Sequence, residues 1–143
     1  MIRAVIDTNV LVSGLLKPAG PPGDILTLLR DGAFIAVFSN KLIDELATVL
    51  TYPKIKTKYG IGRKDLEAIA GLLALRGDLV EIDERVHICR DPDDDFLIET
   101  ALAGKAYFLI TGDQALLSLK KFRGISILKA AAFVASIGTD RAK

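Results

Sequence analysis

The sequence predicts an α/β fold, a three-layer sandwich in which helices flank a central parallel sheet. Half of the 143 residues are hydrophobic, which is enough for a substantial core. Short runs rich in β-branched and aromatic residues alternate with segments of helical spacing. Because each parallel strand needs a crossover that returns the chain, this alternation favours helices on both faces of the sheet. We expect a single domain over 1–143, with a flexible tail from about residue 139.

Five segments have the composition of strands. Three are dense apolar runs bounded by polar or turn-forming residues, at Ile2–Ile6, Phe34–Phe38 and Tyr107–Thr111. Two weaker runs follow the same pattern, at Leu79–Ile82 and Ile125–Leu128. Between them, apolar residues recur at helical spacing, which predicts helices at 22–31, 40–51, 63–76, 94–104, 113–121 and 129–137.

The composition excludes several classes of protein. Nineteen Lys and Arg against eighteen Asp and Glu leave a net charge of +1, so any polyanion must be held by a local patch. The single cysteine, Cys89, and the single histidine, His87, exclude a disulfide framework and a Cys/His zinc site. Charges, Gly or Pro interrupt every apolar run before the roughly 20 residues that cross a bilayer, and the first residues do not resemble a signal peptide. We therefore expect a cytoplasmic protein.

Two aspartates directly follow predicted strands. Asp7 closes the first strand, and Asp113 follows the strand that ends near Thr111. Ligands of open parallel sheets bind beyond the carboxyl ends of the strands, so both carboxylates belong at the expected ligand edge. Each could equally cap the helix that follows it.

A glutamate lies at the border of an apolar helix face. In the predicted helix 40–51 the apolar residues form one stripe at about 100° per residue, and Glu45 lies at its edge. Asp44 falls near the opposite face and is most simply a solvated charge. A glutamate at such an edge also occurs without any functional purpose.

An acidic stretch begins the predicted helix 94–104. Its helical phase places Asp94 at the centre of the inward stripe, with Asp93 and Asp95 about 100° to either side. The positive end of the helix dipole explains acids in a first turn but not an inward one, whose burial costs several kcal/mol unless it is paired or binds metal. An extra turn at the helix start would make Asp95 the candidate site residue in place of Asp94.

Convergence of these acids would create a site for a cation. Two carboxylates about 4 Å apart repel each other by about 4 kcal/mol at an effective dielectric constant of about 20. Such a cluster must take up protons or bind a positive ion. Oxygen ligands without Cys or His select Mg²⁺ or Mn²⁺ over zinc, and these hard ions suit phosphate chemistry.

These residues, taken together, resemble a known family. The chain is similar over nearly its whole length to PIN-domain ribonucleases of the VapC-like toxin type. The resemblance rests on Ile6-Asp7-Thr8-Asn9, on Glu45 with the following Leu46, on Asp94 seven residues before Ala101, on Cys89-Arg90-Asp91-Pro92, and on Thr111-Gly112-Asp113, in which Asp113 lies 19 residues after Asp94.

The resemblance implies a fold, a site and an activity. It implies a cytoplasmic metal-dependent ribonuclease whose products carry 5′-phosphate and 3′-hydroxyl ends, often the toxin of a toxin-antitoxin pair and often a homodimer. By position, the catalytic and metal-binding acids would be Asp7, Glu45, Asp94 and the more variable Asp113, supported by Asn9 and Thr111. Asp91 and Glu99 are candidates for supporting positions.

One basic stretch could hold RNA against such an acidic pocket. It comprises Lys54, Lys56, Lys58, Arg63 and Lys64, interleaved with Tyr52 and Tyr59. The basic side chains could contact phosphates while a tyrosine stacks on a base. A solvated loop that keeps the surface soluble is an equal alternative.

Two other functions stay open at this point. An Asp after the first strand also occurs in aspartyl-phosphate phosphatases and phospho-receiver domains, but Asp7-Thr8-Asn9 lacks the second Asp of the phosphatase motif. A PIN fold could also bind RNA or a protein without catalysis, and the presence of all four acids argues against that. Chelator-sensitive cleavage of RNA would separate the nuclease from both alternatives.

Overall fold

A central six-stranded sheet organises the chain. The computed structural model describes residues 1–89 and 91–142, with side chains through 137. The strand order is β3-β2-β1-β4-β6-β5, with every neighbouring pair parallel except β5 and β6. The strands are β1 (Arg3–Ile6), β2 (Ile35–Phe38), β3 (Gly77–Leu79), β4 (Phe108–Ile110), β5 (Lys121–Phe122) and β6 (Ile125–Leu128).

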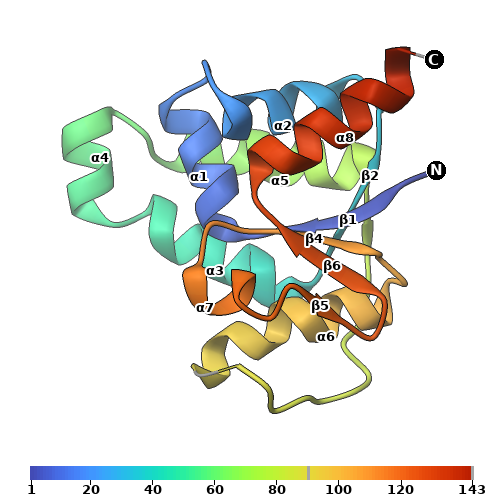
Figure 1. Ribbon diagram of the computed structural model, residues 1–143. Helices are drawn as coiled ribbons and strands as arrows, with labels where there is room; N and C mark the ends of the chain where they lie inside the picture. The colour runs from blue at the N-terminus through green and yellow to red at the C-terminus, as the bar shows by residue number, and fades with distance from the viewer. Residues whose placement is uncertain (90, 143) are drawn as a thin grey trace.

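Helices fill the connections between these strands. They are α1 (Thr8–Leu16), α2 (Pro21–Arg30), α3 (Asn40–Leu50), α4 (Pro53–Tyr59), α5 (Arg63–Arg76), the 3-10 turn η1 (Pro92–Asp94), α6 (Asp95–Ala103), α7 (Gln114–Leu117) and α8 (Ala130–Ala142). In Figure 1, α2 and α8 lie on one face of the sheet and α6 on the other. This is the predicted three-layer α/β architecture.

The core lies where the helices meet the sheet. Phe133 of α8 packs edge-on against Phe34 and Phe108, with ring centroids 5.1 and 5.6 Å apart. Phe34 and Phe133 are both almost fully buried. These aromatic contacts fix α8 against the strands and therefore fix the position of its first residues, which lie near the carboxyl end of β4.

Several predicted elements differ from the observed ones. The strand expected at Leu79–Ile82 lies earlier, at Gly77–Leu79, and the helix expected at 113–121 ends at Leu117, before the antiparallel strand β5. Helices α1 and α4 were not predicted. The helix expected from 94 begins at Asp95, because Pro92–Asp94 form a 3-10 turn.

The flexible tail expected from about residue 139 and the expected cytoplasmic location stay predictions. Helix α8 extends to Ala142, and the side chains of the predicted tail lie outside the described residues. In the residues that the structure describes, no helix has the length and apolar character that a membrane span requires.

Candidate active site

Asp7 lies at the carboxyl end of β1 with both carboxylate oxygens engaged. Its Oδ1 accepts a hydrogen bond from the backbone N–H of Asn9 (3.4 Å), which caps α1, and its Oδ2 accepts one from the Thr111 hydroxyl (2.7 Å). Only 5% of Asp7 is exposed. Burial raises the pKa of Asp7, and the charge of Asp113 raises it further, whereas the bonds from Thr111 and Asn9 lower it without cancelling the increase.

Asp113 lies at the end of the neighbouring strand β4. Its backbone N–H donates to the Thr111 hydroxyl (3.0 Å), and its Oδ1 accepts from the N–H of Ala115 (2.8 Å), capping α7. Because β1 and β4 are adjacent and parallel, Thr111 reaches both acids. Each aspartate therefore caps the helix that follows it, and the Thr111 hydroxyl links the two residues; their role in a shared catalytic site stays a prediction.

Asp94 joins these two acids from the last residue of η1. Burial raises the pKa of Asp94 to about 7, helped by the charge of Asp113, by a hydrogen bond with Asp113, and by the charges of Asp91 and Asp7. A carboxyl that shares a proton with its neighbour is the expected response of crowded acids to mutual repulsion. Asp94 and Asp113 therefore form a hydrogen-bonded pair of carboxyl groups close to Asp7.

Glu45 approaches the same region from α3. Its Oε2 accepts a hydrogen bond from the Thr8 hydroxyl (3.3 Å), which ties α3 to the first residue of α1. Burial raises the pKa of Glu45, and the charges of Asp7 and Asp93 add to the increase, against the opposing effects of Thr8 and Lys41. Glu45 and Asp93 also line one cavity of about 390 Å³, together with Lys41 and Phe96.

Asp7, Asp94 and Asp113 influence one another and Glu45 interacts with Asp7, but the described side chains do not surround a single metal position. Over residues 1–89 and 91–142, no three His, Cys, Asp or Glu side chains are arranged to hold one metal ion. The pKa values of Asp7, Glu45 and Asp94 are raised mainly because burial disfavours their charged forms, and the charges of neighbouring carboxylates add to the increase. The donors are all carboxylate oxygens, a set that fits Mg²⁺ or Mn²⁺ once the protons leave.

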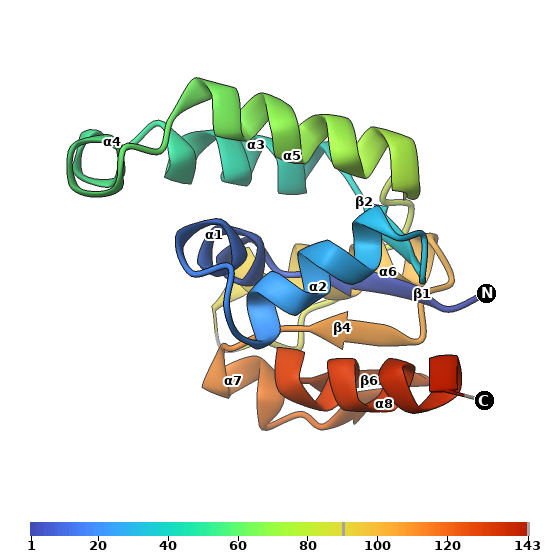
Figure 2. The same ribbon diagram turned by 90° about the horizontal axis from the view of Figure 1, so that it is seen from above.

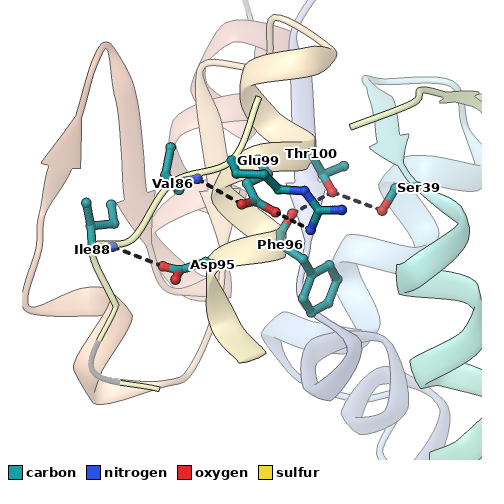
Figure 3. A network of polar contacts seen from close by, with 8 residues as sticks. Ser39, Val86, Ile88, Asp95, Phe96, Glu99 and Thr100 are labelled. Carbon is teal, nitrogen blue, oxygen red and sulfur yellow. Dashed lines mark hydrogen bonds and ion pairs between the residues drawn. The ribbon is translucent and has the colours of Figure 1, made fainter. Parts of the chain in front are cut away.

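The structure assigns different surroundings to Asp94 and Asp95. Helical phase predicted Asp94 as the inward residue, but Asp94 is half-buried and Asp95, at 5% exposed, is the buried one. Asp95 accepts hydrogen bonds from the backbone N–H groups of Cys89 (2.9 Å) and Ile88 (3.3 Å), as Figure 3 shows for Ile88. The Asp95 carboxylate therefore binds backbone N–H groups of the segment before η1, and Asp94 is the residue that bonds to Asp113.

Glu99 has a similar role one helical turn further along α6. Its Oε2 accepts a hydrogen bond from the N–H of Val86 (2.9 Å), and its Oε1 lies 3.9 Å from the Arg85 guanidinium (Figure 3). In the same view, Thr100 connects α6 to Ser39, with 2.9 Å between their hydroxyls. These contacts hold α6 against the preceding segment and the end of β2.

The predicted supporting and basic residues lie in different places. Thr111 contacts both strand-end acids, whereas the side chain of Asn9 is exposed beside a neighbouring cavity. All five predicted RNA-binding residues have exposed side chains: Lys54, Lys56 and Lys58 on α4, and Arg63 and Lys64 at the start of α5. Both views place α4 on the side of the molecule toward which the strands point (Figures 1 and 2).

Sequence reasoning missed three residues beside the acids. Thr8 bonds to Glu45, Asp93 lines the same cavity as Glu45, and the charge of Lys41 opposes the increase in the pKa of Glu45 from one helical turn away. Thr8 follows Asp7 directly, and Lys41 precedes Glu45 by four residues, a spacing that places both on one helix face. That spacing is the signal that could have identified Lys41.

Comparisons with known proteins agree with this architecture. The PIN domain family matches residues 3–115. The uncharacterized protein MJ1680 of Methanocaldococcus jannaschii is 32% identical over 119 residues, which cover 83% of this chain and 76% of that protein. The crystal structure of VapBC2 from Rickettsia felis, bound to a DNA fragment from their promoter, has a similar fold: the TM-score is 0.57 at 14% identity, covering 88% of this chain and 97% of that chain.

The family match includes every acid of the cluster. Asp7, Glu45, Asp94 and Asp113 all fall within residues 3–115, as do the elements that carry them. The overall fold is shared with the solved VapBC2 structure. The chain belongs to the PIN-domain family.

Proposed function

We propose that this protein is a divalent-metal-dependent endoribonuclease that hydrolyses RNA phosphodiester bonds with water. PIN domains are generally nucleases. The observation that carries the proposal is the meeting of Asp7, Asp94 and Asp113, where burial and neighbouring negative charge raise the pKa of Asp7 and of Asp94, with Glu45, whose pKa burial also raises, close by. Acids with perturbed pKa values at the carboxyl edge of a parallel sheet are typical of a functional site.

Mg²⁺ or Mn²⁺ would be held by Asp7, Glu45, Asp94 and Asp113. When bound, such an ion lowers the pKa of water and neutralises charge on the phosphoryl oxygens. The protein supplies orientation, because the Thr111 hydroxyl fixes Asp7 while Thr8 steadies Glu45. Asp94, whose pKa is about 7, must lose its proton to join the site. Neither a histidine nor a covalent nucleophile is needed.

Helix α4 would hold RNA near these acids. From Leu46 to Lys64 the chain has five basic residues and no acidic residue, so this segment is strongly positive in a nearly neutral protein. Tyr52 and Tyr59, at the two ends of α4, are 55% and 46% exposed, so their rings are accessible for stacking on bases. The local charge supplies the attraction that the net charge of +1 cannot.

We further propose a toxin role, with an antitoxin protein as partner, a homodimeric state and a cytoplasmic location. The shared fold with VapBC2 supports the antitoxin partner, since that structure is of a complex of this kind. Light scattering on the purified protein tests the dimer. Co-purification with the product of a neighbouring small gene tests the pair.

The decisive experiment is incubation with mixed RNA in Mg²⁺, in Mn²⁺ or in EDTA. The nuclease proposal expects cleavage with either metal and none with the chelator. Asp7→Asn and Asp94→Asn should each abolish cleavage, whereas Asp83→Asn, the same charge change at an exposed residue, should cleave normally. Binding of RNA without cleavage in any metal would favour a non-catalytic PIN module, and full activity of both site variants would refute the assignment.

A further inference from the structure

A second cavity, of about 290 Å³, adjoins the strand-end acids without including them. Three helices contribute its walls: Val10 and Ser13 of α1, Pro21 and Pro22 of α2, and Ala130 and Ala131 of α8. Thr111 also lines the cavity, and its hydroxyl donates to Asp7. A molecule in this cavity would therefore lie one side chain away from the acid cluster.

The walls suit a flat, mostly apolar ring. Val10 and Ala130 are buried, and the two prolines begin α2, where the ring geometry makes them rigid. Ser13 and Asn9 add a hydroxyl and an amide that can pair with polar atoms on the edge of a ring. Among the described residues that line this cavity, Lys129 alone carries a charge, and it is positive. A mostly apolar cavity with a few polar groups and one cation matches a nucleotide.

Gly112 supplies an independent observation. It also lines the cavity, and a Cβ added to it would meet no atom within 4 Å. The glycines with positive φ are at other positions, so backbone conformation does not require glycine here. Neither packing nor conformation within the described chain explains this residue. A bare backbone between Thr111 and Asp113 instead leaves room for a ligand to pass close to the main chain.

We propose that this cavity binds the nucleobase of the nucleotide next to the scissile phosphodiester, while its sugar-phosphate passes over Gly112. The inference rests on the proposed nuclease function and adds the substrate subsite. Lys129 pairs with a flanking phosphate, which offsets repulsion from the nearby carboxylates. RNA is favoured over a protein side chain because Thr111, which lines the cavity, donates its hydroxyl hydrogen bond to Asp7 of the acid cluster, so that a nucleotide bound here lies next to the acids.

Amide chemical shifts test the occupant directly. The four nucleoside 5′-monophosphates have no internucleotide bond to cleave, so each can be titrated with Mg²⁺ into ¹⁵N-labelled protein. We expect shifts at Ser13, Gly112, Ala130 and Ala131, and weak or no shifts there with ribose 5-phosphate. Ala131→Phe, which fills the cavity from an exposed position, should abolish them. Equal shifts with ribose 5-phosphate, no shifts with any nucleotide, or shifts that follow protein concentration alone would overturn the proposal.

A matched glycine pair tests the role of Gly112. Gly112→Ala adds one methyl group in the path of the substrate, whereas Gly71→Ala adds it on α5, where the new Cβ also meets nothing. We expect Gly112→Ala to weaken single-stranded RNA affinity and kcat/KM by about tenfold, the order expected for losing one stacked base. Gly71→Ala should match the unmodified protein, and circular dichroism should show both variants folded.

The outcomes separate this inference from the function on which it rests. Chelator-sensitive cleavage by the unmodified protein that Gly112→Ala and Ala131→Phe leave unchanged would overturn the subsite and keep the nuclease. Nucleotide shifts at the cavity without any RNA cleavage would overturn the nuclease and keep the cavity as a nucleotide site.

Discussion

At the scale of single residues, Thr111 determines how the acids meet. Its buried hydroxyl donates to Asp7 and accepts from the backbone N–H of Asp113. Both oxygens of Asp7 are therefore fixed, Oδ2 by Thr111 and Oδ1 by the backbone N–H of Asn9, whereas Asp94 contacts Asp113 through a hydrogen bond. Asp7 is the preorganised member of the cluster, and Asp94 is the one whose charge responds to pH.

The raised pKa of Asp94 predicts how stability depends on pH without metal. The pKa is 3.8 for the free side chain and about 7 in the fold, so folding favours the protonated form. That contribution is complete below about pH 3.8 and is lost as the pH rises through about 7. Asp94→Asn stays neutral, so in EDTA its melting temperature should gain on the unmodified protein from pH 4 to 7 and then level off.

Thermal denaturation followed by circular dichroism between pH 4 and 8.5 measures this difference. Asp83→Asn serves as the control, because an exposed carboxylate should give a difference that stays flat with pH. A flat difference for Asp94→Asn as well would show that the fold does not raise the pKa of Asp94.

Asp95 should affect stability with the opposite dependence on pH. Burial alone would raise its pKa, but hydrogen bonds from the backbone and thiol of Cys89 and from the backbone of Ile88 lower it overall. Its stabilising contribution is therefore present above about pH 3.8 and is lost as the pH falls through the lowered value. Asp95→Asn should reduce the free energy of unfolding at pH 7 by about 1–3 kcal/mol, the usual penalty for weakening a buried charged hydrogen bond.

Urea unfolding at pH 7 and pH 3 tests the role of Asp95. The loss should be large at pH 7 and small at pH 3. Equal losses at both pH values would mean that the packing of Asp95 matters and its charge does not.

At the scale of elements, apolar density identified the strands and spacing identified most helices. The strands β1, β2, β4 and β6 lie within their predicted runs because each is a short apolar segment between polar residues. Helix α1 escaped prediction because Thr8–Leu16 is apolar on most sides, so it lacks a clear polar face. Helix α4 escaped for the opposite reason, since none of its residues is buried.

The start of α6 explains why Asp95, and not Asp94, is the buried aspartate. The assignment of inward-facing positions assumes α-helical geometry from Asp94 onward. In the structure Pro92–Asp94 form a 3-10 turn, so the α-helix begins one residue later, at Asp95. Asp95 therefore took the buried position that the sequence assigned to Asp94. No local pattern in the triple of aspartates indicates that Asp95 binds backbone amides several residues earlier.

Helix α4 should behave as an electrostatic arm for RNA. It has few contacts outside its junction with α3, and the Lys58 Nζ lies 5.3 Å from the centroid of the Tyr59 ring. Reversing charge at Lys56 and Arg63 should weaken binding of single-stranded RNA. Each lost phosphate contact should reduce the slope of log affinity against log salt by about 0.7.

Fluorescence anisotropy over a salt series measures this slope, with Asp94→Asn as background so that RNA stays intact. Arg30→Glu is the matched control, because Arg30 is an exposed cation at the end of α2, before the amino end of β2. A salt slope unchanged by the double reversal would assign the α4 lysines to solubility alone.

At the scale of the whole molecule, strand order decides which acids meet. Asp7 and Asp113 are far apart in sequence, yet β1 and β4 are neighbours at the centre of the sheet. Glu45 lies on α3 and Asp94 lies in η1, so neither belongs to a strand of the sheet. Alternating strands and helices predict a parallel sheet but not its order, because many orders satisfy the same alternation. The candidate acids could be predicted individually, and their contacts required the topology.

The fold therefore holds carboxylates that repel one another, and a divalent ion should stabilise it. An ion that binds the folded state at 100 times its dissociation constant adds about 2.7 kcal/mol. Mg²⁺ or Mn²⁺ should raise the melting temperature more at pH 8 than at pH 6, because the proton on Asp94, with a pKa of about 7, competes with the ion. Asp7→Asn should lose most of this increase, and Asp83→Asn should keep it. Differential scanning calorimetry at matched ionic strength measures the effect, and an equal increase in Asp7→Asn would place the ion elsewhere.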